Sequence, residues 1–428
     1  MRAIQSKLVT ESFMSVGTKA AEVIVSLIVV ILLGRLLGAE GFGVYAFGLA
    51  IVSILSMPTR LGLPQLVVRE TAAGQATGRW ASVVGIWRWS TAASLILGLA
   101  VALIGICLML ALGQSTTTSG ITLLIGMLLV PLLSLSSLRS GVLRGLRHVG
   151  AANVTGLLAQ PAMLVLLLVG FILLSEGALT PPMAIGLTVI SALFSFLLGT
   201  LIIRRKRPAE AKGVMPEFTP RKWLSAAWPM AMTKGAHQLN RYVDIIILGL
   251  MATMVDSGIY RIAAQGAILV SLGMVAMGLV TAPRFAHLHA LGQYEELQRL
   301  IRQSTQLALI LSSLVTIGFA VAGRPVLIWL FGEEFHQAWL PLMILSVGHV
   351  LSTAIGPTGL VLNMTGHERY VTRAVSVAAL VNIALNLALI PYFGAVGAAI
   401  ATGTALVFWK TWLWFTAKRV LGMRCSVF

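Results

Sequence analysis

RRKRPAEAKGVMPEFTPRK, residues 204–222, is the longest polar interruption in a chain of 428 residues that is otherwise a succession of apolar runs. It holds four consecutive basic residues and prolines at positions 208, 216 and 220. Six apolar runs precede it and six follow, and a helix of about 20 such residues crosses the ~30 Å hydrocarbon core of a bilayer. The stretch therefore predicts a chain of two halves, each with six membrane-spanning helices.

The composition indicates that lipid is the solvent for most of the chain. Apolar residues make up 57% of it, charged residues only 11%, and the mean hydropathy is +0.92. Soluble domains carry about 25% charged residues. The first apolar run, residues 13–33, is longer than a signal-peptide core of ~7–15 residues and lacks a small-residue cleavage site, so we expect it to be retained as the first helix.

We predict an all-α integral membrane protein with about twelve transmembrane helices in two pseudo-symmetric six-helix bundles. The predicted domains are an N-terminal bundle over residues 1–203, a basic cytoplasmic linker over 204–222 and a C-terminal bundle over 223–428. The predicted spans are residues 12–33, 42–58, 89–112, 121–138, 154–174, 181–203, 224–251, 258–281, 305–330, 339–362, 374–390 and 395–417.

The net charge of +17 is distributed unevenly between the two sides of the predicted membrane protein. The N-terminal side holds 24 of the 31 Lys and Arg residues, and the opposite side holds Arg35 and Arg324. This asymmetry is the positive-inside pattern, which places both termini in the cytoplasm. The basic charge then reflects topology and anionic lipid, and no nucleic-acid partner is expected. The remaining five basic residues lie inside spans: Lys19, Lys234, Arg241, Arg261 and Lys410.

Short matches at a nearly constant offset indicate an internal repeat. Gly43-Val44-Tyr45 opens the second predicted helix, and the similar Gly258-Ile259-Tyr260 opens the eighth. Gly177 and Gly394, which are separated by almost the same interval, precede the sixth and twelfth helices. Because six helices return the chain to the same side, the halves should share their orientation about an axis along the membrane normal. The dipeptide Gly356-Pro357 is expected to break the tenth helix.

Three segments carry a resemblance to a known family. They are GRLLGAEGFGVYAFGLAIVSIL (residues 34–55), LRGLRHVGAANV (143–154) and LNMTGHERYVTRAVSVAALVNIALNLALIPYFGAVGAAIATG (362–403). Through them, the whole chain resembles the bacterial polysaccharide-exporter and O-antigen flippase family, in a superfamily that also holds multidrug exporters and lipid II flippases. These patterns are more specific for the superfamily than for the polysaccharide branch.

The resemblance implies a fold and a cargo. The implied fold is a V-shaped pair of six-helix bundles around a central cationic cavity that opens alternately to each side of the membrane. The implied cargo is a lipid-linked oligosaccharide, in which a pyrophosphate joins a sugar chain to a polyprenyl lipid. The resemblance places the protein in the bacterial cytoplasmic membrane, where it would serve assembly of O-antigen, capsule or exopolysaccharide. The implied partners are membrane lipids and other membrane proteins of that assembly.

Cations inside the spans are the candidates for holding this anionic cargo: Lys234, Arg241, Lys19 and Arg261. Charges in hydrocarbon are costly and generally face a cavity or a partner. Lys234 lies about 16 Å into its span at ~1.5 Å per residue, with no acidic residue three or four positions away. The interval between Lys19 and Lys234 equals that between Gly43 and Gly258, so we expect the two lysines to be counterparts in the repeat. Arg261 fits either a cavity rim or the external interface, and Lys410 is predicted to be an interfacial anchor.

Glu22, Asp244 and His237 are the candidates for binding a coupling ion or a proton. Glu22 follows Lys19 by three residues, and Asp244 follows Arg241 by the same interval. This spacing fits ion pairs within each helix equally well. Coupling and simple neutralisation therefore both stay open, as does downhill movement without a coupling ion.

Absent motifs argue against an enzyme. The sequence has no G-x-x-x-x-G-K-[ST] loop for ATP, and its two cysteines and scattered histidines predict no metal or cofactor site.

The charge inside the predicted spans favours an anionic cargo. Five intramembrane cations against the carboxylates of Glu22 and Asp244 leave a net charge of +3. The alternatives are a cation-coupled multidrug exporter, which should show unpaired carboxylates, and a membrane glycan polymerase, which should carry a long outer loop.

The topology is testable by labelling single cysteines with an impermeant thiol reagent in intact cells. In a background without Cys107 and Cys425, Lys212→Cys and Gln303→Cys should be protected and Thr117→Cys should react, because the first two lie on the predicted cytoplasmic side. Ready labelling at position 212 from outside would overturn the predicted orientation.

Overall fold

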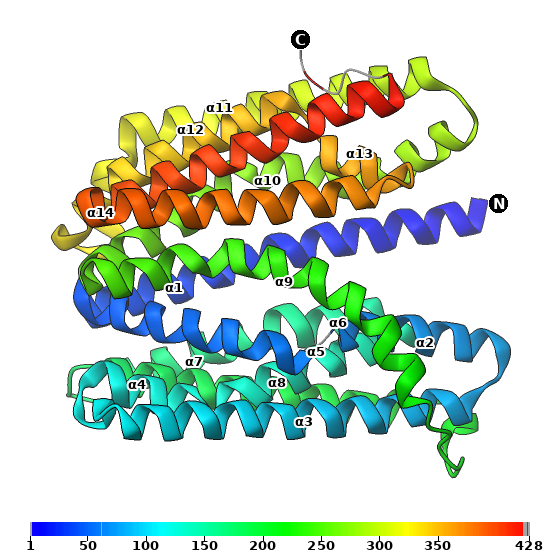
Figure 1. Ribbon diagram of the computed structural model, residues 1–428, viewed down its shortest axis with the longest axis horizontal. Helices are drawn as coiled ribbons and strands as arrows, with labels where there is room; N and C mark the ends of the chain where they lie inside the picture. The colour runs from blue at the N-terminus through cyan, green and yellow to red at the C-terminus, as the bar shows by residue number, and fades with distance from the viewer. Residues whose placement is uncertain (1, 61, 423–425, 427–428) are drawn as a thin grey trace. The chain divides into compact units, whose positions relative to one another are not determined.

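The computed structural model describes residues 2–60, 62–422 and 426, and this part of the chain consists of helices and short connections (Figure 1). No side chain is described before Gly17 or at residues 228, 229, 232–234, 236 and 237. The helices before the linker are α1 (Arg2–Arg60), α2 (Leu63–Thr77), α3 (Trp80–Ala111), α4 (Thr118–Gly126), α5 (Leu129–Gly145), α6 (Val149–Asn153), α7 (Ala159–Leu174) and α8 (Pro181–Lys206). Those after it are α9 (Pro220–Met251), α10 (Met254–Ala290), α11 (Tyr294–Phe331), α12 (Trp339–Ile355), α13 (Thr358–Met364) and α14 (Glu368–Leu421).

The helices account for the predicted number of membrane spans. Nine helical segments of the described part are long and apolar enough to cross a membrane. Two of these, α1 and α14, contain a non-helical glycine, Gly38 and Gly394, and so count as two spans each. The 32-residue α9 adds one more. The prediction of about twelve transmembrane helices is confirmed, and the protein is a multi-pass membrane protein.

Glycines with positive φ turn the chain between paired spans. Gly38 has φ 67° and Gly394 has φ 52°, values that a residue with a side chain rarely adopts. Figure 1 shows the two limbs of α14, in orange and red, on either side of the second turn. A carboxylate accepts a hydrogen bond from the first backbone N–H after each turn, Glu334 at 2.8 Å after Gly38 and Asp256 at 3.1 Å after Gly394. These acceptors satisfy N–H groups that a helix N-terminus leaves unpaired.

Internal contacts divide the chain into two compact units. The first comprises Met1–Leu37 and Val44–Gln238, and the second comprises Gly38–Gly43 and Leu239–Phe428. The boundary falls inside α9, whose beginning packs with the first unit. The division into residues 1–203, 204–222 and 223–428 describes the sequence repeat and stays a prediction.

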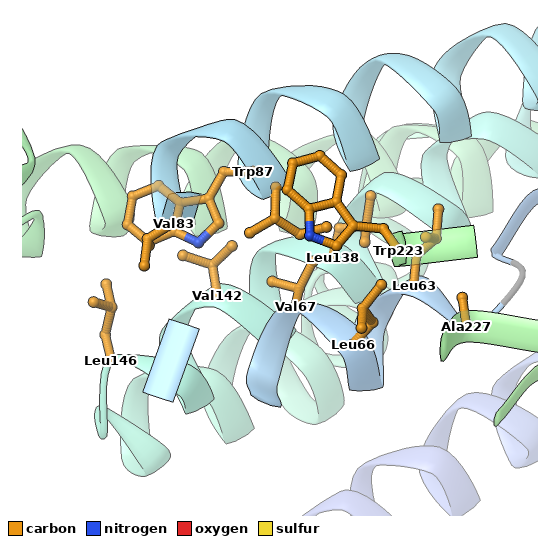
Figure 2. Packing of buried hydrophobic residues seen from close by; sticks show 11 residues of the cluster. Leu63, Leu66, Val67, Val83, Trp87, Leu138, Val142, Leu146, Trp223 and Ala227 are labelled. Carbon is orange, nitrogen blue, oxygen red and sulfur yellow. The ribbon is translucent and has the colours of Figure 1, made fainter. Parts of the chain in front are cut away.

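A buried cluster explains why the beginning of α9 belongs to the first unit (Figure 2). Trp223 is 1% exposed and lies with Ala227 against side chains of α2, α3 and α5. The Trp87 indole donates a hydrogen bond of 2.8 Å to Thr71 on α2, which ties α2 to α3. The sequence analysis predicted no helix between the second and third spans, so it missed α2. The cluster consists of Leu63, Leu66, Val67, Val83, Ile86, Trp87, Leu138, Val142, Leu146, Trp223 and Ala227.

Several helices continue beyond the apolar runs that predicted them. Arg88 lies inside α3 and Arg139 inside α5, although both fell in predicted connections. A helix continues as long as its backbone hydrogen bonds form, even where side chains are charged. A prediction from hydropathy, in contrast, ends the span at the first charged residue. The expected break at Gly356-Pro357 is confirmed, because α12 ends at Ile355 and α13 begins at Thr358.

The sequence repeat reappears as a reciprocal contact in the second unit. A Cβ added to Gly43 would overlap the Met254 carbonyl oxygen, and a Cβ added to Gly258 would overlap that of Ala39. The interval from Ala39 to Met254 is the same as that from Gly43 to Gly258. The backbones at the two Gly-x-Tyr motifs therefore lie in contact, and they can approach this closely because glycine has no Cβ.

Replacing Gly43 by alanine should destabilise the protein because a side chain there would meet backbone that cannot rotate away. Overpacking of this kind typically costs about 1–3 kcal/mol. The matched control is Gly48→Ala in the same limb of α1, where the new Cβ would lie 3.4 Å from the Thr122 side chain, an ordinary contact. Thermal unfolding of the purified variants in detergent measures the difference. Equal melting temperatures would contradict the close approach.

Candidate functional site

A buried carboxylate in the second unit collects the polar side chains of three helices. Asp244 of α9 is 2% exposed, and around it lie Tyr260 of α10 and Asn382, Asn386 and Thr402 of α14. Both limbs of α14 take part, because the asparagines precede the turn at residue 394 and the threonine follows it. We call these five residues the Asp244 cluster.

Each carboxylate oxygen of Asp244 accepts two hydrogen bonds. Oδ2 accepts from the hydroxyls of Tyr260 at 2.6 Å and Thr402 at 2.7 Å. Oδ1 accepts from the side-chain amides of Asn382 at 2.8 Å and Asn386 at 2.7 Å. An ionised carboxylate can accept all four, and hydrogen bonds to a charged group are stronger than neutral ones. The cluster is therefore built to hold a negative charge away from water.

The first unit contains the uncharged counterpart of this cluster. The hydroxyl oxygens of Tyr45 and Thr188 are hydrogen bonded at 3.1 Å, and those of Tyr260 and Thr402 lie 3.0 Å apart. The interval of the Gly-x-Tyr repeat relates Tyr45 to Tyr260, and an interval one position shorter relates the two threonines. The residue that precedes Asp244 by the repeat interval, and so corresponds to it in the first half, is Val29. The repeat therefore keeps the tyrosine–threonine pair in both halves and adds a carboxylate in one.

The structure treats the two predicted acid–base pairs differently. Lys19 and Glu22 form an ion pair of 2.7 Å within α1, with side chains 42% and 22% exposed. Arg241 does not pair with Asp244: it is exposed and lies over the Tyr242 ring at 5.9 Å. Of the two predicted i,i+3 pairs, only Lys19–Glu22 in the first unit forms an ion pair. In the second unit, hydrogen bonds from the uncharged members of the Asp244 cluster take its place.

The remaining predicted cations are not members of the Asp244 cluster, and the side chain of one of them lies outside the described residues. Arg261 is half-buried on α10, next in sequence to Tyr260. Lys410, the predicted interfacial anchor, donates to the Gly356 carbonyl at 3.4 Å and lies over the Trp409 ring at 4.9 Å. The side chains of Lys234 and His237 lie outside the described residues. Their predicted roles stay predictions.

The donor set of the Asp244 cluster decides which ion it could hold. In the described part of the chain, no group of three or more His, Cys, Asp or Glu residues lies close enough to share a metal ion. The cluster instead offers one carboxylate with amide and hydroxyl oxygens, and the side-chain oxygen of Asn386 is buried and accepts no hydrogen bond from any described residue. Hard oxygen donors with a single negative charge suit a monovalent cation or a proton better than a transition metal.

Comparisons with known proteins supply the family. Residues 8–289 match the family described as "Polysaccharide biosynthesis protein". The chain belongs to this family. The chain is also similar to two proteins of Haloferax volcanii. They are the "probable flippase AglR", 25% identical over 93% of this chain and 80% of that protein, and the "probable low-salt glycan biosynthesis flippase Agl15". Agl15 is 26% identical over 38% of this chain, and the match spans only 34% of Agl15.

Solved structures agree with this family on the fold. An inward-facing multidrug resistance MATE family transporter of the MOP superfamily has a TM-score of 0.77 at 15% identity, over 94% of this chain and 96% of that one. The lipid II flippase MurJ in an inward closed conformation has a TM-score of 0.72 at 16% identity, over 95% and 87%. At such identity the likeness establishes the fold alone, which is that of the MOP superfamily transporters.

Sequence reasoning identified Asp244 but missed the other members of its cluster. A signal was present, because Asn382 and Asn386 are four residues apart and therefore share one helix face inside an apolar run. Tyr260 stood in the Gly-x-Tyr motif, where it served only as a mark of the repeat. Two amides on one buried face need a polar partner, and Asp244 is 138 residues before the first of them.

The repeat provides its own control for the strength of the Asp244 cluster. Tyr260→Phe should lower the free energy of unfolding by about 1.5–3 kcal/mol, because it removes a donor to a charged group. Tyr45→Phe, which removes the bond to the neutral Thr188 hydroxyl, should cost about 0.5–1.5 kcal/mol. Thermal unfolding of both variants in one detergent compares them. If the two tyrosines prove equally costly, Asp244 does not carry the charge inferred here.

Proposed function

We propose that this protein is a flippase that moves a polyprenyl-pyrophosphate-linked oligosaccharide across the cytoplasmic membrane of a bacterium by alternating access. The cargo would serve assembly of O-antigen, capsule or exopolysaccharide. The observation that carries the proposal is the family match over residues 8–289, supported by alignment with AglR along nearly the whole chain. The MOP transporter fold supports it further, since MurJ, which shares this fold, is named a lipid II flippase.

The pyrophosphate of this cargo requires compensating charge inside the membrane. We assign this role to Lys234, Arg241, Lys19 and Arg261, which bring positive charge from both halves of the repeat. Because cations hold an anionic head without contacting each sugar, the same site serves a long and variable glycan. The polyprenyl tail stays in lipid throughout.

The Asp244 cluster is the proposed coupling site. A buried carboxylate is costly even where neutral side chains donate to it, and a bound cation or proton lowers that cost. Rotation of the Asn386 amide would turn its unpartnered oxygen toward the same space as the Asp244 carboxylate and the Thr402 hydroxyl. Binding and release of a monovalent cation would then favour different arrangements of α9 and α14 and so bias the transport cycle. Glu22 is paired with Lys19 and is the weaker candidate, and His237 belongs to the same proposal.

The proposed orientation places both termini in the cytoplasm, because the positive-inside asymmetry puts 24 of 31 basic residues on their side. Cargo would be loaded there and released at the opposite face. Its partners would be the lipid-linked oligosaccharide, membrane lipids and other membrane proteins of polysaccharide assembly.

The cargo is tested in cells that lack this protein. Lipid-linked oligosaccharide should accumulate on the cytoplasmic leaflet, and the wild-type gene should restore its passage outward. Lys234→Ala should fail to restore it although the variant reaches normal abundance in the membrane, and Lys234→Arg should restore part of it because the charge is kept. Leaflet location is measured by access of an impermeant glycan-modifying enzyme to the lipid.

Two results would point to a different function. Hypersensitivity to cationic drugs with normal surface glycan would favour a multidrug exporter. Accumulation of unextended lipid-linked units on the outer leaflet would favour a polymerase. Full restoration by Lys234→Ala would remove that lysine from the proposed cargo site while leaving the flippase proposal intact.

A further inference from the structure

A second charged site lies in the first unit, on the side of α5 where α3 and α8 both pack against it. Arg139 of α5 extends its half-buried side chain to both neighbours. Its Nε donates to the Thr200 hydroxyl of α8, and its Nη1 donates to the Thr91 hydroxyl of α3, each at 3.2 Å. The guanidinium also lies 5.3 Å from the centre of the Phe196 ring on α8. Its direction is thus fixed by three side chains from two helices.

The surroundings of Arg139 leave its charge uncompensated. The two threonines and the phenylalanine are neutral, and within the described part of the chain no carboxylate lies at ion-pair distance from it. A guanidinium has five N–H donors, and the two threonines occupy two of them. A half-buried positive charge with free donors is the arrangement that binds the phosphate of an anion in two-pronged fashion.

Two further arginines flank Arg139 on the same helices. Arg88 precedes Thr91 by three residues on α3, and Arg204 follows Thr200 by four on α8, and both are exposed. Residues at these intervals share a helix face, about 5 Å apart along the axis. Because α3 begins and α8 ends at the linker side of the bundle, both arginines lie one turn nearer to that side than the threonines do.

Away from the linker side, the same faces become apolar and exposed. Leu95 follows Thr91 by four residues and is 39% exposed, and Leu197 precedes Thr200 by three residues and is 49% exposed. In a multi-pass membrane protein, exposed leucines in the middle of spans face the hydrocarbon of the lipid. Around the two threonines, the side chains therefore change within one helical turn from exposed arginines on the linker side to exposed leucines away from it.

We propose that Arg139, with Arg88 and Arg204, binds the phosphate headgroup of an anionic phospholipid in the leaflet at the linker side. The lipid's phosphate would bond to the free donors of Arg139 between α3 and α8, and its acyl chains would lie over Leu95, Phe196 and Leu197. A soluble phosphate would use only the arginines, so the exposed leucines next to them favour a lipid. The site belongs to the first unit and does not depend on the proposed transport of glycan.

The test is lipid titration of the intact purified protein by native mass spectrometry, with phosphatidylglycerol as the anionic probe and phosphatidylcholine as the neutral one. The wild type should bind phosphatidylglycerol more tightly. Arg139→Gln should weaken that binding about tenfold, the loss expected when a charge-assisted bond is removed, and leave phosphatidylcholine binding unchanged. Arg139→Lys should keep only part of the preference, because the charge remains but the two-pronged geometry of the guanidinium is lost. The matched control is Arg299→Gln on α11, an exposed arginine of the second unit, which should behave as the wild type.

Three outcomes would overturn the site. The first is equal phosphatidylglycerol affinity in the wild type and Arg139→Gln. Such a result, with a lowered melting temperature, would make Arg139 a purely structural link between α3, α5 and α8. The second is an equal loss for both lipids in Arg139→Gln, which would mean that the variant has only disturbed the packing of α3, α5 and α8. The third is displacement of bound phosphatidylglycerol by millimolar inorganic phosphate in the wild type, which would show that the site takes a free anion rather than a lipid.

Discussion

The carboxylate of Asp244 imposes the strongest physical constraint on the second unit. A charge buried in a membrane protein is tolerated only where polar partners replace water, and four donors do so here. These donors come from α10 and from both limbs of α14, so their bonds to the carboxylate tie α9 to both helices. Any event that neutralises Asp244 weakens those bonds together. A cation or proton at this point therefore acts on the packing of the whole unit.

The repeat explains how such a site fits within a symmetric framework. Tyr45 and Thr188 in the first unit repeat the tyrosine–threonine pair of the second, and Gly43 and Gly258 make reciprocal backbone contacts. These features maintain helix packing in both halves. The charge differs, since Val29 stands where the second half has Asp244. The first unit carries its own unusual charge in Arg139, which lies among neutral side chains, so the two halves share a scaffold and differ in chemistry.

The sequence was sufficient for the features that hydropathy and glycine encode. Apolar runs predicted the twelve spans, and Gly43 and Gly258 indicated the repeat. The helix α2 escaped because its apolar face is buried by Trp87 and Trp223, residues distant in sequence. The Asp244 cluster escaped for the same reason: a pair of asparagines in an apolar run has no visible partner until the fold brings α9 beside α14. The sequence analysis placed Arg139 in a connection, although it lies inside α5 between α3 and α8. Hydropathy cannot distinguish a charge that ends a span from a charge inside a helix that continues past the apolar run.

Coupling through Asp244 is most directly measured in proteoliposomes that contain a fluorescent polyprenyl-pyrophosphate-linked oligosaccharide and an imposed sodium or proton gradient. The wild-type protein should move the lipid faster when one of these gradients is present. Asp244→Asn should retain its fold and move the lipid at a rate that neither gradient changes, because the amide carries no charge for a cation to neutralise. A full response to the gradient in Asp244→Asn would contradict the role assigned to the buried carboxylate.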